Sequence, residues 1–258
     1  MDSISIEAFA KINLGLKILG RREDGYHEIE STLQTISLAD LLRISKSSTS
    51  GIGLHVEPNL GISDDENLAC RAAKRFFAQA GIGDQGVEIK LTKRIPAGTG
   101  LGGGSSDAAA ALHALNALFE TGFSTEQLMA LGFNIGSDVP FFGRGGTAIA
   151  SGRGERLQFL GSTKCTESVV VLIPQVRLGT QRVYEKWDTL SERDISRDDA
   201  AATHHLRNDL EAAALALEPA LTEYLDFVKA HATGPFGMSG SGSAWFALFE
   251  DATDAKSV

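Results

Sequence analysis

The sequence predicts an α+β protein made of two units with a cleft between them. Strand and helix patterns are mixed along the first part of the chain, and the pattern changes near residues 161–164. With 258 residues and 43% apolar content, the chain is able to bury a substantial core, as one large or two modest domains. We therefore divide it into residues 1–162 and 163–258, since clefts between such units are preferred places for small ligands.

In the first part, residues 4–19 and 27–44 predict strands, and residues 52–56 predict a short one. Residues 64–80 predict a helix, because they begin with the acidic sequence DDEN and carry basic residues later. The alternation of Val87, Ile89 and Leu91 then predicts a strand that ends before Pro96.

A helix follows the next loop, and its apolar side is marked by Ala108, Ala111, Leu112, Leu115 and Leu118. Ser124 and Thr125 with Gln127 form a partial capping box before a short helix over residues 126–131. Further on, the apolar run at 169–174 predicts a buried strand, 193–232 predicts helix with Pro219 in a first turn, and 244–249 predicts a closing strand.

Composition limits the classes of function. The net charge of −9 and pI near 5.2 argue against a nucleic-acid-binding surface. Cys70 and Cys165 are too few for a disulfide framework or a cysteine-rich metal site. The N-terminus lacks the pattern of an export signal, and no apolar run reaches the roughly 20 residues of a membrane span. We expect a cytoplasmic protein without a membrane partner.

Residues 96–112, PAGTGLGGGSSDAAAAL, predict a phosphate-binding loop. Glycine lets backbone N–H groups approach a ligand closely, and a helix start adds unpaired N–H donors and a positive dipole end. A flexible linker is the alternative for such a composition. The strand before the loop and the helix after it argue against a linker, because they bracket the loop tightly.

Three nucleotide-binding motifs compete for this loop. A P-loop needs a Gly-Lys pair, and the chain has none. The dinucleotide pattern G-x-G-x-x-G is present as Gly98, Gly100 and Gly103, with Glu120 at a suitable distance, although Glu120 follows a helical stretch where the motif needs the end of a strand. A nicotinamide- or flavin-dependent oxidoreductase therefore stays open as an alternative.

The third motif is P-x-x-x-G-L-G-S-S with extra glycines, which Pro96, Gly100, Leu101, Gly102 and the serine pair at 105–106 fit. Three further blocks support it in order: residues 8–31, residues 135–142 and residues 237–249. The chain resembles the GHMP kinases, the small-molecule kinases related to galactokinase, homoserine kinase and mevalonate kinase. The resemblance implies an N-terminal domain like domain 2 of ribosomal protein S5 over 1–162 and a ferredoxin-like domain over 163–258.

The resemblance also implies ATP and Mg²⁺ as cofactors and an alcohol as acceptor. The residues expected to bind ATP are Pro96, Gly98, Gly100, Leu101, Gly102, Gly103, Gly104, Ser105 and Ser106. Within the family, the blocks match the branch that phosphorylates a cytidine diphosphate ester of isoprenoid precursor biosynthesis. Another GHMP kinase, with a different acceptor, is an alternative, and so is a ligand sensor that keeps the pocket without catalysis.

Lys11 and Asn13 are the first candidate pair. On a strand they point away from Ile12 and Leu14, and they lie roughly 7 Å apart along one face. From periodicity alone, this face is equally typical of solvent-exposed strands. The resemblance implies instead that Lys11 stabilises the transferred phosphoryl group and that Asn13 orients a hydroxyl.

Asp138, in the sequence GSDVPFF, is the candidate base. Alone it would suit a turn or a helix cap. The family pattern matches this block except at Ser137, and it places the catalytic aspartate at Asp138. That Asp138 meets Lys11 is implied only by the resemblance.

Tyr26 and His27 are the candidate specificity residues. A tyrosine ring stacks on a flat base and a histidine bonds to its edge, but EDGYH also fits a hairpin turn with an inward tyrosine. The resemblance implies that this segment holds cytosine, with Tyr184 on the opposite face. The second glycine-serine loop, with Gly240, is expected at the phosphate end of the substrate, although its pattern also fits a tight turn.

Some residues are left open. His204 and His205 fit a solvated helix start better than a metal site, and Asn208 and Asp209 match family positions of open role. Asp107 at the helix start is expected to cap the helix, because a free carboxylate there would repel phosphate. Family members usually continue through a further helix and strand after the last strand found here, so the resemblance implies a short C-terminal domain.

Overall fold

The computed structural model describes residues 2–59, 61–83, 85–161, 167–190 and 204–256. The chain forms two compact units. The first consists of Met1–Ala10, Thr35–Ile95 and Gly102–Gly145, and the second of Lys11–Gln34, Pro96–Leu101 and Gly146–Val258. The second unit draws residues from both sides of the predicted boundary at residues 162 and 163. That boundary lies outside the described residues and stays a prediction.

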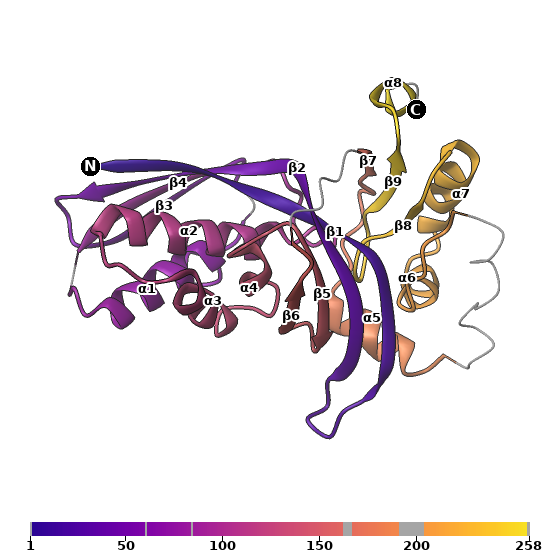
Figure 1. Cartoon of the computed structure of the whole chain (residues 1–258), viewed down its shortest axis with the longest axis horizontal. Coiled ribbons are helices and arrows are strands. Elements are labelled where there is room, and N and C mark those ends of the chain that lie inside the picture. The colour runs from indigo at the N-terminus through magenta and orange to yellow at the C-terminus, as the bar shows by residue number, and fades with distance from the viewer. Residues whose placement is uncertain (1, 60, 84, 162–166, 191–203, 257–258) are drawn as a thin grey trace. The chain divides into compact units, whose positions relative to one another are not determined.

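In the first unit, helices cover a sheet. Strand β3 (Gly51–Glu57) pairs in parallel with β4 (Gly86–Thr92), which pairs antiparallel with residues 41–47 of β2 (His27–Ser47). Strand β1 (Ser3–Arg21) also pairs with β2. The helices are α1 (Leu68–Ala80), α2 (Gly103–Phe119), α3 (Thr125–Phe133) and α4 (Val139–Phe142). Figure 1 shows α1 and α2 along the same face of β2, β3 and β4.

The core of the first unit is built around the predicted apolar side of α2. Ala108, Ala111, Leu112 and Leu115 are at most 1% exposed. Small alanine side chains bring α2 close to its neighbours, and Phe76 of α1 fills the space beside it with no exposed surface. The prediction of this helix is confirmed.

The ends of two helices show how local chemistry sets the boundaries. The side chain of Asn67 accepts the N–H of Ala69 at 2.9 Å and caps α1, so this helix begins at Leu68 and not at residue 64 as predicted. The acidic DDEN sequence precedes the helix. Before α3, Ser124 and Gln127 form the predicted capping box, with both bonds present.

In the second unit, residues 29–34 of β2 pair with β5 (Thr147–Gly152), and β5 pairs with β6 (Arg156–Phe159). A separate antiparallel sheet has the order β7 (Ser168–Leu172), β9 (Trp245–Phe249), β8 (Phe236–Met238). The helices are α5 (Thr180–Trp187), α6 (Glu211–Leu217), α7 (Leu221–His231) and α8 (Ala252–Ala255). Helices α6 and α7 lie beside β8 and β9 (Figure 1) and share a core with Trp245.

The prediction that residues 193–232 are helical is confirmed for α6 and α7 and is wrong for residues 204–210. Residues 204–210 precede the helical region, and α6 and α7 are separate helices divided at residues 218–220. Pro219 lies in this gap, where it has no N–H to continue a helix. Residues 193–203 of this prediction lie outside the described residues. In the described ranges, no helix is both long and apolar enough to cross a membrane.

We predict that Phe76→Ala lowers the free energy of unfolding by about 3–5 kcal/mol, the usual cost of emptying a buried phenylalanine site. The Phe76 ring contacts Phe77 and Phe123, each with centroids 5.8 Å away. Urea unfolding measures the change. Phe133→Ala, at a position 39% exposed, is the control and should cost less than about 1 kcal/mol. Equal losses would contradict the assignment of the core.

Candidate active site

Lys11 and Asn13 lie side by side on β1 in the second unit, with 4% and 6% of their surfaces exposed. Lys11 Nζ donates a hydrogen bond to Asn13 Oδ1, and Asn13 Nδ2 donates to Ser31 Oγ at 2.8 Å. The prediction that the two share a strand face is confirmed. The alternative of a solvent-exposed face is wrong, because both side chains are buried and polar partners replace their water.

Gly240 approaches this pair from the second glycine-serine loop. A Cβ atom at Gly240 would lie 3.2 Å from Asn13 Oδ1 and 3.4 Å from Lys11 Nζ. Asn208 anchors the loop, since its Nδ2 donates to the carbonyl oxygens of Met238 and Gly240, both at 2.8 Å. The structure therefore gives Asn208 the role that the sequence left open.

Asp209, the neighbour of Asn208, anchors strand β1 itself. Its Oδ2 atom accepts the N–H of Ile18 at 2.8 Å, and its Oδ1 atom accepts from Arg207 Nε at 2.7 Å. The adjacent N–H of Leu16 donates to the carbonyl of Arg207 at 2.9 Å. These bonds hold the strand that carries Lys11 and Asn13 in place.

The first half of the glycine loop, Pro96–Leu101, packs against the same residues of the second unit. The carbonyl of Leu101 accepts the N–H of Lys11 at 3.0 Å. Ser239 Oγ donates to the carbonyl of Gly100 at 3.0 Å and accepts the N–H of Asn13 at 3.3 Å. Gly100 has a φ of 80°, and a Cβ atom there would lie 2.1 Å from the Ser239 carbonyl oxygen. Only glycine allows this approach.

The second half of the loop belongs to the first unit and starts helix α2. The N-cap is Gly102, with a φ of 73°, and it makes no side-chain capping bond. The first helical bond runs from Ser106 N–H to the Gly102 carbonyl at 2.9 Å, so Gly103, Gly104 and Ser105 have no N–H partner within the helix. These amides at a positive dipole end suit an anion. Ser106 Oγ instead donates to the Phe9 carbonyl at 2.7 Å.

Asp107 does not cap α2, so this expectation is wrong. Its Oδ2 atom accepts from Lys93 Nζ at 2.7 Å, and Lys93 also donates to Asp40. Burial raises the pKa of Asp107 to about 7, and the nearby Lys93 ammonium opposes this rise only in part. The position of Asp107 beyond the first turn explains the error, because a capping side chain must stand before the helix.

Asp138 lies in the first unit, directly before α4. It occupies the N-cap position without a side-chain capping bond, which argues against a purely capping role. The neighbouring Gly136 lies near the start of α2, since a Cβ atom there would be 3.8 Å from Ser105 Oγ. Lys11 belongs to the second unit, so the meeting of Asp138 with Lys11 stays a prediction.

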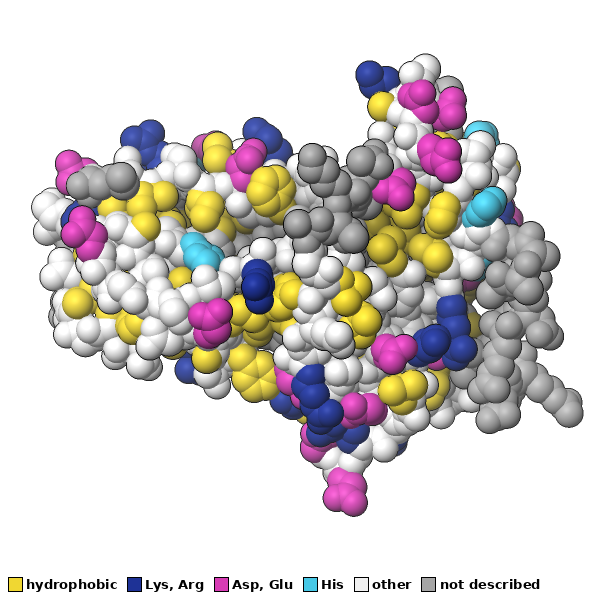
Figure 2. Space-filling view, in the orientation of Figure 1, with side chains coloured by type: hydrophobic (Ala, Val, Ile, Leu, Met, Phe, Trp, Pro, Cys, Tyr) yellow, Lys and Arg dark blue, Asp and Glu magenta, His cyan; other side chains and the backbone are white. Residues whose placement is uncertain are grey.

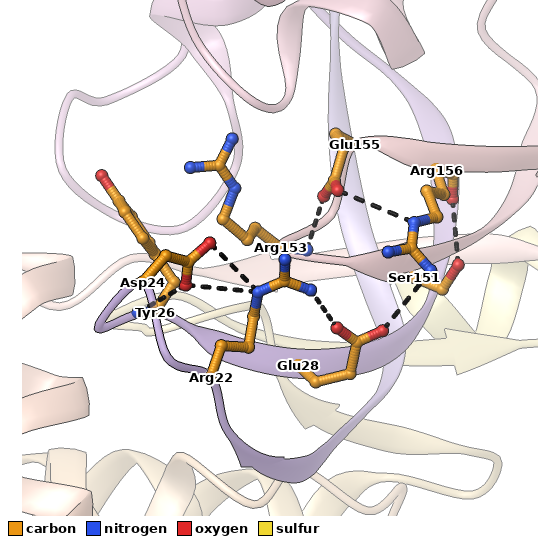
Figure 3. A network of polar contacts seen from close by, with 8 residues as sticks. All are labelled: Arg22, Asp24, Tyr26, Glu28, Ser151, Arg153, Glu155 and Arg156. Carbon is orange, nitrogen blue, oxygen red and sulfur yellow. Dashed lines mark hydrogen bonds and ion pairs between the residues drawn. The ribbon is translucent and has the colours of Figure 1, made fainter.

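The predicted base-binding residues lie in the second unit. Tyr26 is 57% exposed, and the Arg153 guanidinium lies over its ring, 4.7 Å from the centroid. Figure 3 shows the two side chains next to each other. His27 is buried, and its ring stacks on Tyr184 with centroids 4.9 Å apart. The placement of Tyr26 and Tyr184 on opposite faces of a base stays a prediction.

His27 is held by helix α5 from three sides. Besides Tyr184, Trp187 meets the ring edge-on at 5.4 Å, and Asp188 Oδ1 lies 2.7 Å from His27 Nε2. The sequence analysis missed Asp188, because nothing in the local pattern links it to a residue 161 positions earlier. Its carboxylate orients the His27 ring.

A network of charged side chains fixes the tip of the β1–β2 hairpin (Figure 3). Arg22 forms ion pairs with Asp24 and Glu28. Glu28 Oε1 also lies 3.9 Å from Arg156 Nη1. Asp24 Oδ1 accepts the N–H of Tyr26 at 3.2 Å. Charges of both signs gather over this hairpin in Figure 2. The network presents the exposed ring of Tyr26 in a fixed place.

A cavity of about 360 Å³ in the first unit was not predicted. It is lined by Leu54, His55, Val56, Glu57, Asn59, Ile62, Asp64 and Asn67. The Glu57 carbonyl accepts the N–H of Lys93 at 2.7 Å, so the cavity adjoins the segment that leads into the glycine loop. Its walls come from β3 and the approach to α1, which are far from the loop in sequence.

Two family models match the chain. The GHMP kinases N terminal domain matches residues 67–146, and the GHMP kinases C terminal model matches residues 190–258. The chain belongs to the GHMP kinases. This family membership confirms the predicted family, the phosphotransferase class and the two-domain fold, and it favours a kinase over the nicotinamide-dependent oxidoreductase. As a GHMP kinase, the chain uses ATP as its phosphoryl donor.

Individual relatives are similar over nearly the full length. A 4-diphosphocytidyl-2-C-methyl-D-erythritol kinase of Clostridium beijerinckii is 38% identical, covering 98% of this chain and 93% of its own. A kinase of the same name from Pelotomaculum thermopropionicum is 42% identical, and the match covers 99% of this chain and 92% of the relative. A crystal structure of 4-(cytidine 5'-diphospho)-2C-methyl-D-erythritol kinase matches this GHMP kinase with a TM-score of 0.82 at 39% identity, covering 98% and 93%.

A more distant structure shares the fold. A homoserine kinase from Cytophaga hutchinsonii matches with a TM-score of 0.73 at 18% identity, covering 99% of this chain and 88% of its own. At this identity the likeness concerns the arrangement of the backbone alone. It agrees with the predicted GHMP fold for both parts of the chain.

We predict that Gly100→Ala damages this GHMP kinase more than Gly98→Ala. Both glycines have a positive φ, which costs other residues about 1–2 kcal/mol. A Cβ atom at Gly98 would meet only Arg177 at an ordinary 3.7 Å, whereas Gly100 meets a carbonyl oxygen. Gly100→Ala should therefore lose about 1–3 kcal/mol more in urea unfolding. It should also bind an ATP analogue about tenfold more weakly, or ~1.4 kcal/mol. Equal effects of the two variants would contradict the close approach at Gly100.

Proposed function

We propose that this protein transfers the γ-phosphoryl group of ATP to the 2-hydroxyl of 4-diphosphocytidyl-2-C-methyl-D-erythritol, a step of non-mevalonate isoprenoid precursor biosynthesis in the cytoplasm. The observation that carries the proposal is the buried Lys11–Asn13 pair, packed against both glycine loops of a GHMP kinase. The names of the relatives support this acceptor. The exposed Tyr26 ring beside the buried His27 supports a flat base as part of the substrate.

In the proposed reaction, the substrate 2-hydroxyl attacks the γ-phosphorus and the bond to the ADP oxygen breaks. Such transfers pass through a loose transition state, so the protein contributes mainly alignment and charge. Lys11 stabilises negative charge on the transferred group, and Asn13 fixes its ammonium. Asp138 aligns the hydroxyl and accepts its proton late in the transfer.

The glycine loop seats the ATP phosphates on the free amides of Gly103, Gly104 and Ser105, with Pro96, Gly98 and Leu101 shaping the approach. The cavity beside β3 is lined by three apolar side chains, Leu54, Val56 and Ile62, and by five polar ones, a mixture that offers both packing and hydrogen bonds to the nucleoside part of ATP. Among the described residues, no group of three or more His, Cys, Asp or Glu side chains is arranged to hold a metal. Bound Mg²⁺, which screens the phosphates, would accordingly take its ligands chiefly from phosphate oxygens and water, as this ion commonly does.

We predict that Asp138→Asn lowers kcat by about 10²–10⁴-fold, the usual contribution of a positioned base, and leaves ATP-analogue binding almost unchanged. Coupled ADP release with the cytidine substrate measures turnover. Asp65→Asn is the matched control, because the Asp65 side chain is 85% exposed. Full activity of Asp138→Asn would remove Asp138 from the reaction, and a protein without turnover in either form would be a sensor.

We predict that Tyr26→Ala raises KM for the cytidine substrate by roughly 5–150-fold, since base stacking on an aromatic ring contributes about 1–3 kcal/mol. KM for ATP should stay the same. Tyr26→Phe keeps the ring and should behave like the unchanged protein. Turnover of homoserine or mevalonate at the same rate as the cytidine substrate would contradict the proposed specificity.

A further inference from the structure

A buried cluster of three charged side chains lies beside the glycine loop in the first unit. Lys93 Nζ donates to Asp40 and to Asp107, and the side chains of Lys93, Asp40 and Asp107 are 7%, 0% and 4% exposed. Asp40 belongs to β2 and Asp107 to α2, and Lys93 directly follows β4. The proposed phosphoryl transfer uses none of the three, and removing such charges from water is costly unless their pairing and hydrogen bonds compensate.

The two carboxylates of the cluster differ in their hydrogen bonds. Asp40 Oδ1 accepts the backbone N–H groups of Arg94 and Ile95, the latter at 2.8 Å, and its Oδ2 accepts from Lys93. Asp107 Oδ2 accepts from Lys93, but its buried Oδ1 has no partner in the described part of the protein. Both oxygens of Asp40 thus have hydrogen-bond donors, and Asp107 is the carboxylate with room for a proton.

The cluster touches the first turn of α2, where the free amides lie. A Cβ atom at Gly103 would be 3.2 Å from Lys93 Nζ. Asp107 follows Gly103 by one turn, roughly 6 Å along the axis, and side chains on a helix lean toward its N-terminus. This separation is shorter than the Debye length of about 8 Å at physiological ionic strength, so salt does not screen the interaction fully.

The charges make Asp107 sensitive to an anion at the loop. With both carboxylates ionised the cluster carries one net negative charge, and with one proton added it is neutral. Lys93 and Asp40 are the charged side chains whose influence on Asp107 the structure records, and burial already raises the pKa of Asp107 to about 7. A phosphate at the helix start favours the protonated form further.

We propose that Lys93 and Asp107 are positioning residues for the nucleotide, and that Asp107 takes up a proton from solvent when the ATP phosphates bind at the glycine loop. Through Asp107, Lys93 holds the N-terminal part of α2, and through Asp40 it holds the segment before the loop. The proton adds to Asp107 Oδ1, and no bond of ATP is broken in this step. The inference rests on the proposed function, in which this loop binds ATP.

The test is calorimetric titration of the complete protein with the ATP analogue AMP-PNP at pH 7, in buffers of different ionisation enthalpy. On binding AMP-PNP, the unchanged protein should take up more protons than Asp107→Asn, by a fraction of one proton per site. Protonation of the analogue itself is common to both and cancels in the comparison. Between pH 6 and pH 8.5, the affinity of the unchanged protein should fall several-fold more than that of Asp107→Asn.

Equal proton uptake in the two proteins would overturn the inference while leaving ATP binding intact. Failure of AMP-PNP to bind at all would overturn both the inference and the proposed function. If Asp107→Asn does not fold, carboxyl NMR of the unchanged protein decides: the titration midpoint of Asp107 should rise on adding AMP-PNP. A midpoint that does not move would contradict the proposal.

Discussion

The close contact between Gly100 and Ser239 is the constraint on which the candidate site in the second unit depends. The Ser239 hydroxyl bridges the Gly100 carbonyl and the Asn13 amide, and the Ser239 carbonyl occupies the space that a side chain at residue 100 would need. Two glycine-containing loops, 139 positions apart in the sequence, can therefore share one contact. Lys11 is held at the same place, because its N–H binds the neighbouring Leu101 carbonyl.

Two lysine side chains of the structure, those of Lys11 and Lys93, are buried, and they differ in their hydrogen-bond partners. Lys11 is removed from water and donates a hydrogen bond to the amide oxygen of Asn13. Lys93 is removed from water between two carboxylates, so its ammonium is paired within the protein.

The aromatic residues of the hairpin also divide into two kinds. His27 is enclosed by α5 through stacking, an edge contact and a carboxylate, which leaves little freedom for its ring. Tyr26, the next residue, is exposed and is kept in position by the backbone bond from Asp24 and by the Arg153 guanidinium. An enclosed histidine beside an exposed tyrosine ring suits the recognition of a flat ligand.

The sequence by itself determined the features that depend on short spacings. Alternation placed Lys11 and Asn13 on one strand face, the apolar spacing of α2 marked its core side, and the glycine loop with its flanking blocks identified the family. The start of α1 was misplaced, since an Asn67 cap competes with composition as a boundary signal, and the described residues 204–210 were wrongly included in a helical region.

Only the tertiary structure decided the contacts between residues distant in the chain. Asp188 beside His27, Ser31 beside Asn13 and Lys93 between its carboxylates leave no local pattern, because each is an ordinary residue until folding removes its water. Asp107 shows the difference most directly: its place near a helix start suggested a cap, whereas burial and a lysine from the segment after β4 set its bonding and its pKa. Spacing fixes which side chains share an element, and packing fixes which of them lose solvent and must find partners.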